Sequence, residues 1–366
     1  NKNTDDYFRG GQRIPWWAAG LSIFATILSS LTFIAIPAKA YATDWVQSVV
    51  NLGILLVAPF LIYFILPFFR KIDATSAYEY LEQRFSVFVR LLASATFVFF
   101  QIGRMAIVMF LPSLALATIT PLSVENCILV MGVLSILYCT LGGLEAVIWT
   151  DAIQSVILLG GALLSFALII ANLDGGFSEF YTVASAQQKF HIANWEWDVA
   201  SVTRSAFWVV LLGGVAQQMV PGASDQAVIQ RYMSVNSESK ARKAIWTNAV
   251  VSMPATLIFF ALGTALFVFY KANPTRLDPH FQIDAVFPLF IANELPVGLA
   301  GLVVAGIFSA AQSTISTSMN STSTSIVTDF VRRFSLLNSE KKYLNLARIL
   351  TVTLGITGTG FALLLA

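Results

Sequence analysis

The chain has 366 residues, of which 57% are hydrophobic and 11% are charged. Soluble domains carry about 25% charged residues, so this composition excludes a water-soluble protein and makes a lipid bilayer the main partner of the surface. The net charge of +2, without a basic cluster interleaved with aromatic residues, gives no sign of nucleic-acid binding.

Nine segments are apolar enough and long enough to cross a bilayer, which takes about 20 residues in a helix. In chain order they are Ile14–Tyr41, Trp45–Phe69, Val87–Ile119, Leu122–Leu141, Glu145–Leu173, Val202–Met219, Ala244–Tyr270, Pro296–Phe330 and Tyr343–Ala366. Shorter amphipathic helices are predicted at Ser76–Phe85, Phe177–Gln188, Asp225–Met233 and Ala285–Asn293. The sequence therefore predicts an all-α integral membrane protein with a single transmembrane domain over residues 1–366.

The loops after the second, sixth and eighth predicted spans are rich in lysine and arginine. Their basic residues are Arg70, Lys71, Arg84 and Arg90, then Arg231, Lys240, Arg242 and Lys243, then Arg332, Arg333, Lys341, Lys342 and Arg348. Because short basic loops stay on the cytoplasmic side, these loops and the N-terminus are predicted to be cytoplasmic.

The first predicted span carries hydroxyl groups in its middle, at Ser29, Ser30 and Thr32. A break in the helix here would release backbone carbonyls for a cation and turn half-helix ends toward a substrate. The alternative is structural, because these hydroxyls can also bond to their own helix or to a neighbouring one.

Arg104 lies near the middle of the third predicted span. An unpaired arginine in hydrocarbon is strongly unfavourable, so its guanidinium must face a cavity or a partner. A guanidinium binds a carboxylate through two parallel hydrogen bonds, which suggests an anchor for an anionic substrate. The alternatives are a structural pair with an acid such as Asp151, or a side chain that reaches the membrane interface.

Asp151 stands just inside the fifth predicted span, on the side assigned to the cytoplasm. A carboxylate within a membrane is by default a candidate binding group for an ion or a proton. The alternative is that Asp151 caps its helix, because an acidic group near a helix N-terminus is favourable.

The eighth predicted span is filled with hydroxyl groups from Ser309 to Ser325. Ser309, Ser313, Ser316 and Thr317 share one face at helical spacing. Hydroxyl oxygens are hard, neutral ligands that suit a small cation such as sodium. We expect the upper part of this span to bind an ion, and the run Ser321–Ser325 to serve the close packing of helices.

The sequence contains no H-E-x-x-H pair, no Walker loop, no G-x-S-x-G turn and no paired cysteines at zinc spacing. These motifs are the usual signs of a metalloprotease, an ATPase, a serine hydrolase and a zinc site. We therefore expect a protein that is not an enzyme and that is not driven by ATP.

Taken together, the motifs resemble the sodium/solute symporter family, whose members include sodium–sugar, proline and sialic acid transporters. The segments that carry the resemblance are Asp6–Gly11 before Ile14–Trp17, Ala25–Phe33, Thr75–Phe85, Gly142–Asp151, Asp225–Tyr232 and Ser313–Ser321. They extend over essentially the whole chain.

The resemblance implies a LeuT-type fold, which consists of two inverted repeats of five helices with a broken first helix. Residues 1–173 would form the first repeat and residues 202–366 the second. Nine of the ten core helices are then expected, with the last helix of the second repeat missing.

For the main sodium site, the resemblance implies the backbone carbonyls of Ala25, Leu28 and Ala310 with the hydroxyls of Ser313 and Thr314. Neutral oxygens bind a monovalent cation weakly enough to release it after transport. A second sodium, as in some family members, would lie near Asp151 with Ser313, Ser316 and Thr317. The expected cargo ion is thus Na+, with one or two per cycle, and a proton at Asp151 in place of one sodium stays open.

Among family members, the position of Arg104 is most similar to the sialic acid branch, where an arginine of the third helix meets the sugar carboxylate. The resemblance places Ser29 and Thr32 beside it, with Gln47 on the substrate hydroxyls. It also allows Phe207 and Trp208 to cover the site, while core packing is an equally good reason for these two aromatic residues.

We therefore expect a sodium-coupled symporter that imports an acidic sugar, sialic acid (N-acetylneuraminate), by alternating access through a bacterial inner membrane. Another carboxylate or solute, such as proline, pantothenate, a short-chain acid or a sugar, is the alternative substrate. An ion channel is the alternative from a different class, but Arg104 within the membrane would repel cations. A sensor or enzyme on the same fold would need an appended domain.

Overall fold

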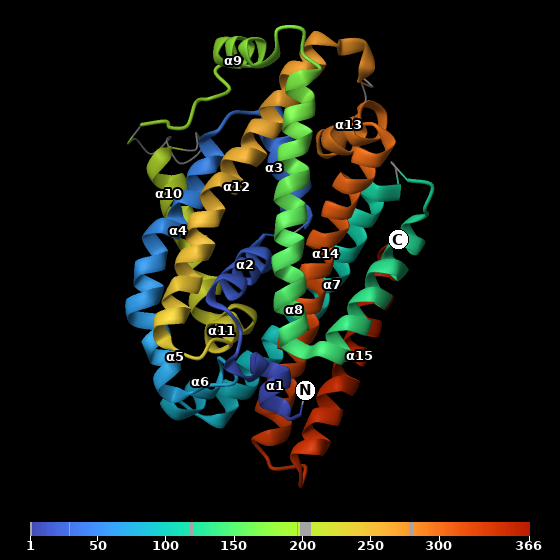
Figure 1. Cartoon of the computed structure of the whole chain (residues 1–366). Coiled ribbons are helices and arrows are strands. Elements are labelled where there is room, and N and C mark those ends of the chain that lie inside the picture. The colour runs from blue at the N-terminus through green and yellow to red at the C-terminus, as the bar shows by residue number, and fades with distance from the viewer. Residues whose placement is uncertain (1, 29, 118–119, 196, 198–205, 278–280) are drawn as a thin grey trace.

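The computed structural model describes residues 2–28, 30–117, 120–195, 197, 206–277 and 281–366, and the described part of the chain is almost entirely helical (Figure 1). The longer helices are α2 (Trp16–Ile27), α3 (Ser30–Ala42), α4 (Val49–Phe60), α7 (Val87–Ala117), α8 (Val124–Ala171), α10 (Phe207–Ser224), α12 (Glu238–Ala272), α14 (Val297–Ser325) and α15 (Glu340–Leu365). The shorter ones are α1 (Thr4–Arg9), α5 (Leu66–Ile72), α6 (Glu79–Arg84), α9 (Gly176–Ala186), α11 (Gln226–Met233) and α13 (Val286–Glu294). The four predicted amphipathic helices correspond to α6, α9, α11 and α13.

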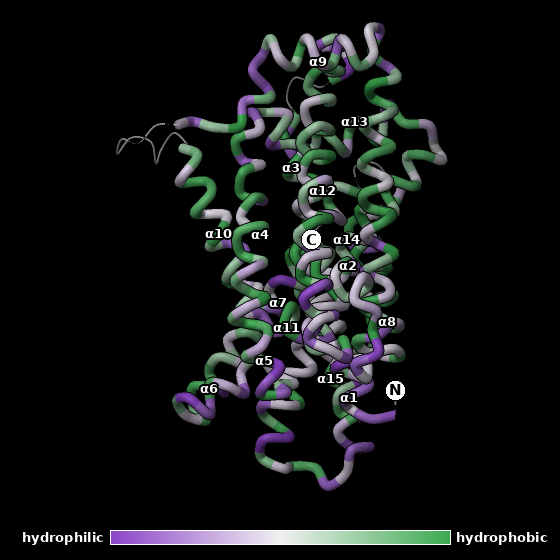
Figure 2. Tube along the Cα trace, turned by 60° about the vertical axis from the view of Figure 1, so that its left-hand side comes forward, coloured by the Kyte–Doolittle hydropathy of each residue, from purple (hydrophilic) through white to green (hydrophobic). Residues whose placement is uncertain are grey.

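Six helices of the described part are long and apolar enough to cross a membrane, or seven if the bent pair α2 and α3 counts as one span. The spans predicted at Leu122–Leu141 and Glu145–Leu173 are the two arms of the single long helix α8. The span predicted at Val202–Met219 corresponds to α10, which is not one of the six helices. Hydrophobic residues run along the middle of the helices, whereas hydrophilic ones gather toward the two ends (Figure 2). This distribution is the one that a bilayer requires.

The first predicted span is broken, as expected. Helix α2 ends at Ile27, and Leu28 follows it in an extended conformation, with φ −81° and ψ 112°. The segments Trp16–Ile27 and Thr32–Ala42 differ in direction by 61°. The break leaves the last carbonyls of α2 without helical partners, so they are available to other groups.

The two arms of α8 meet at Gly143, where φ is 61° and ψ is −149°. A Cβ atom at this position would lie 2.7 Å from the backbone oxygen of Tyr7 on α1. Only glycine adopts this backbone conformation without strain, and only glycine allows so close an approach. Gly143 therefore sets the angle between the arms and with it the position of Asp151, which lies on the second arm.

A second break separates α10 from α11. Asp225 stands between them with φ −78° and ψ 119°, nearly the backbone angles of Leu28, and its side chain accepts a hydrogen bond of 2.7 Å from the Ala227 amide. This Asp225 cap agrees with the start predicted for the amphipathic helix. All eight residues of α11 are buried, so the helix is inserted among its neighbours and does not lie on the surface.

Helix α14 packs along α8 and also contacts α7 and α15, while α2 packs against α8 and α12. The hydroxyl side chains of α14 from Ser313 to Ser325 are all buried, at most 1% exposed. Ser323 donates a hydrogen bond of 3.0 Å to the backbone oxygen of Ala347 on α15, which is the close helix contact predicted for this part of the span. Polar atoms are thus concentrated between α2, α8, α11 and α14.

Candidate functional site

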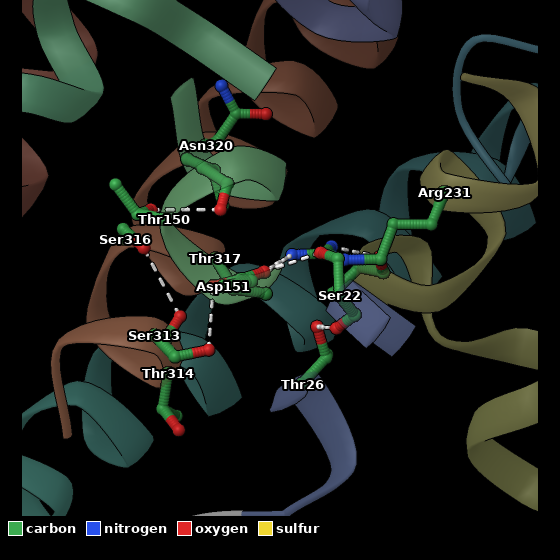
Figure 3. A network of polar contacts seen from close by, with 12 residues as sticks. Ser22, Thr26, Thr150, Asp151, Arg231, Ser313, Thr314, Ser316, Thr317 and Asn320 are labelled. Atoms are coloured by element: carbon green, nitrogen blue, oxygen red, sulfur yellow. Dashed lines mark hydrogen bonds and ion pairs between the residues drawn. The ribbon is translucent and has the colours of Figure 1, made fainter. Parts of the chain in front are cut away.

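A polar network lies where α2, α8, α11 and α14 meet, and Asp151 is at its centre (Figure 3). The carboxylate is fully buried. Oδ2 accepts hydrogen bonds from Ser22 Oγ at 2.5 Å and from Arg231 Nη2 at 3.0 Å, and Oδ1 accepts one from Ser313 Oγ at 2.7 Å. These donors come from three different helices, so Asp151 holds α2, α11 and α14 to α8.

Arg231 is the charged partner of Asp151, and it is as completely buried as the acid. Nε donates to Ser22 Oγ at 2.6 Å, Nη2 to Thr317 Oγ1 at 2.5 Å, and Nη1 to the Ala227 backbone oxygen at 2.5 Å. A buried ion pair is stable only when its remaining donors and acceptors are also satisfied, and this one has such partners.

The loop assignment of Arg231 in the sequence analysis was therefore wrong. Arg231 was counted among the basic residues of the loop after the sixth predicted span, whereas the structure places it, fully buried, in α11. A buried aspartate such as Asp151 requires a cationic partner. An aspartate inside a predicted span and an arginine inside a predicted amphipathic helix were the signal that could have identified this pair.

Arg104 projects from α7 toward the break in the first span. Its Nη2 donates a hydrogen bond of 3.0 Å to the backbone oxygen of Thr26, in the last turn of α2. The alternative in which Arg104 pairs with Asp151 does not occur in the structure, because Asp151 pairs with Arg231. The guanidinium of Arg104 is instead placed at the broken end of α2.

A small cavity of about 10 Å³ lies beside Leu28 and brings together four of the five residues proposed for the main sodium site, namely Ala25, Leu28, Ala310 and Ser313. The fifth residue, Thr314, donates a hydrogen bond of 3.4 Å to the backbone oxygen of Ala310. A cavity of this size holds about one water molecule or one small ion. The size of the cavity and the residues that line it are compatible with sodium as a transported ion.

The residues of the second predicted sodium set lie together, but their oxygens already have partners. Ser316 Oγ donates to the Ser313 backbone oxygen at 3.2 Å, and Thr317 Oγ1 accepts from Arg231. In this arrangement, the guanidinium of Arg231 is the cation that contacts Asp151 and Thr317. A sodium ion on these oxygens would have to share them with Arg231.

A larger cavity of about 100 Å³ lies on the other side of the break, between α2, α3, α4, α10 and α12. Its polar lining consists of Thr32, Asn51, Gln217, Gln218, Ser252 and Thr256. Phe24 and Leu28 line both this cavity and the 10 Å³ cavity, so the two spaces are neighbours across the break.

Of the substrate residues predicted from the sequence, Thr32 lines this larger cavity. Gln47 lies in the short 3₁₀ turn Val46–Ser48 before α4, and Phe207 begins α10, where its ring packs on Trp195 with 4.7 Å between ring centroids. Neither of them lines the cavity, nor does Arg104, which contacts Thr26 at the broken end of α2. Ser29 lies outside the described residues. Asn51, four residues after Gln47 and within α4, lines the cavity and was missed.

Two comparisons of the sequence give consistent results. A model of the sodium:solute symporter family matches residues 7–361. The chain is 43% identical over 357 residues to the sodium/sialic acid symporter SiaT of Proteus mirabilis, covering 97% of this chain and 71% of that protein. It is 41% identical over 360 residues to the sodium/sialic acid symporter NanT of Aliivibrio fischeri, covering 98% of this chain and 70% of that protein.

The comparison of structures agrees with these matches. A solved structure described as the substrate-bound outward-open state of a Na+-coupled sialic acid symporter superposes with a TM-score of 0.94 at 41% identity, over 100% of this chain and 77% of that one. The match confirms the predicted LeuT-type helical fold. The relatives are transporters, which agrees with the expectation that this chain is not an enzyme.

Proposed function

Because this chain belongs to the sodium:solute symporter family, we propose that it imports sialic acid together with sodium across a bacterial inner membrane. Membership makes it a multi-pass membrane transporter that uses sodium. The proposed substrate rests on the two bacterial relatives, which are both sodium/sialic acid symporters, and on the solved Na+-coupled sialic acid symporter.

The observation that carries this proposal is the pair of cavities on the two sides of Leu28. The smaller one suits a single ion, and the larger one offers amide and hydroxyl groups, which are the partners that sugar hydroxyls need. Phe24 and Leu28, at the broken end of α2, line both cavities. An ion bound in the smaller cavity would therefore hold in place two residues that also line the larger one. Such a shared wall gives the two ligands a coupling free energy.

We assign the main sodium site to the carbonyls of Ala25, Leu28 and Ala310 and the hydroxyls of Ser313 and Thr314. The 10 Å³ cavity among four of these residues supports the assignment. The set of Asp151 with Ser313, Ser316 and Thr317 is the proposed second site. One sodium at the main site, with a second at Asp151, is therefore the stoichiometry to test.

For the substrate, we assign Arg104 to the sialic acid carboxylate, because it offers a guanidinium at the broken end of α2. Thr32, which lines the larger cavity, is proposed to contact the substrate, and Ser29, Gln47 and Phe207 remain proposed substrate residues from the sequence. Asn51, Gln217 and Gln218 join them as proposed partners of the sugar hydroxyls, since they line the larger cavity.

The two inverted repeats, residues 1–173 and 202–366, remain part of the proposal. The similar backbone angles at Leu28 and Asp225 support it, because both positions interrupt the first long helix of their half. We also propose that the end of the bundle with α1, α6 and α11 faces the cytoplasm (Figure 1), where the basic loops lie.

Binding to the purified protein tests the proposed function. N-acetylneuraminic acid is expected to raise the unfolding temperature in sodium chloride and to have little effect in potassium chloride of equal ionic strength. At a ligand concentration of about 100 times Kd, the stabilisation is about 2.7 kcal/mol. Its methyl ester, which lacks the negative charge, is the matched control and should stabilise weakly.

Equal stabilisation in sodium and potassium would contradict sodium coupling. Stabilisation by proline or lactate, without any by N-acetylneuraminic acid, would keep the symporter assignment and replace the substrate. The two parts of the proposal can therefore fail separately.

A further inference from the structure

Helix α11 is attached to α14 by two neighbouring side chains. Arg231 reaches Thr317 and, on α8, Asp151. Gln230 Nε2 donates to Asn320 Oδ1 at 2.8 Å and to Thr324 Oγ1 at 3.0 Å, farther along α14. Because all of these groups are buried, the contacts act where little water competes for them.

The contacts of Arg231 overlap with the second proposed sodium site. Arg231 Nη2 lies 3.0 Å from Asp151 Oδ2 and 2.5 Å from Thr317 Oγ1. Asp151 and Thr317 are also two members of the set proposed to bind the second sodium. Two cations on the same pair of oxygens repel each other strongly, and burial weakens the screening that would relieve this repulsion.

We propose that Arg231 is a tethered competitor for the second sodium ion. A sodium ion that binds among Asp151, Ser316 and Thr317 displaces the guanidinium, and α11 then loses one of its two attachments to α14. This inference rests on the proposed function, because it requires the second sodium site. Arg231 thereby sets the sodium concentration at which the second site fills and couples that event to the position of α11.

The alternative to this proposal is an ion pair between Arg231 and Asp151 that sodium never breaks. Sodium would then bind without touching it, or would not bind at Asp151 at all. The structure offers a second buried pair for comparison, in the π-helical segment Ile326–Arg332 that follows α14. There Arg90 Nη2 contacts Asp329 Oδ1 at 2.8 Å, and Ser76 and Ser94 donate to Oδ2. None of these residues belongs to a proposed sodium set, so Arg90 provides the control.

Sodium titration of the unfolding temperature, with choline chloride keeping the ionic strength constant, tests the competition. Arg231→Gln is expected to lower the half-saturating sodium concentration on the order of tenfold, because the competing charge is gone. Arg231→Lys keeps a cation and should lie between this variant and the unchanged protein. Arg90→Gln should leave the half-saturating concentration unchanged.

An unchanged or higher half-saturating concentration in Arg231→Gln would overturn the proposal, and so would an equal effect of Arg90→Gln. If Arg231→Gln does not fold, the comparison of Arg231→Lys with the unchanged protein still decides, since a weaker ion pair must favour sodium. Ser316→Ala separates this inference from the site on which it rests. A sodium response that is unaffected by Ser316→Ala removes the second site itself.

The loosening of α11 that follows the loss of its Arg231 attachment has its own readout. Thr324→Cys introduces a thiol at the position that Gln230 contacts on α14. This thiol should react faster with a thiol reagent in sodium chloride than in choline chloride. The acceleration should vanish when Ser316→Ala is added. A rate that sodium does not raise would contradict the loosening of α11.

Discussion

Arg104→Ala is expected to abolish sodium-driven uptake of sialic acid. The guanidinium lies at the broken end of α2, bonded to the Thr26 backbone oxygen, and in the proposed complex it binds the substrate carboxylate. Removing one partner of a buried, hydrogen-bonded charge pair costs about 2–5 kcal/mol, which corresponds to roughly a 30-fold or greater loss of affinity. The measurement is initial uptake of radiolabelled N-acetylneuraminic acid into liposomes over a range of concentrations.

Arg104→Lys is the informative control, because it keeps the charge and loses the paired donors of the guanidinium. It should retain weak uptake with a raised KM. Uptake by Arg104→Ala within about twofold of the unchanged protein, a free-energy difference below about 0.5 kcal/mol, would remove Arg104 from carboxylate binding.

The second large effect is expected for Ser313→Ala, which should sharply weaken activation by sodium. Ser313 lines the 10 Å³ cavity and also donates to Asp151 at 2.7 Å, so it belongs to both proposed ion sites. Loss of one charge-assisted contact is worth about 1.5–3 kcal/mol, so the sodium concentration for half-maximal uptake should rise about tenfold or more.

Ser165→Ala is the matched control for this variant. Ser165 is also a buried serine, but its hydroxyl bonds to the Gly161 backbone oxygen within α8 and touches no proposed ion ligand. A sodium dependence that is the same in Ser313→Ala and Ser165→Ala would exclude Ser313 from the ion sites.

The fold was largely accessible from the sequence, because hydropathy and composition reflect what a bilayer demands. The break near Leu28 was expected from the hydroxyl groups in the first span, and the amphipathic helix α11 was predicted over Asp225–Met233. The angle between the two arms of α8 was not predicted, because the kink at Gly143 depends on its contact with the backbone of Tyr7, which lies far away in the sequence. Tertiary contacts of this kind leave no periodic pattern.

The site was only partly accessible, for a related reason. Asp151 and Ser313 were identified because polar groups in apolar spans need an explanation. Arg231 was misplaced because a basic residue after a span normally belongs to a loop, and the burial of α11 follows from its packing among other helices. Asn51 was missed in favour of Gln47 because the start of α4, and thus the face toward the break, is set by a short 3₁₀ turn.

Transport itself tests the central claim most directly. The protein is reconstituted in liposomes, and uptake of radiolabelled N-acetylneuraminic acid is compared with an inward sodium gradient, with equal sodium on both sides, and with potassium in place of sodium. We predict saturable uptake that accumulates the acid above its external concentration only under the sodium gradient. Uptake that is equal in all three conditions, or that never exceeds the external concentration, would contradict sodium-coupled import of sialic acid.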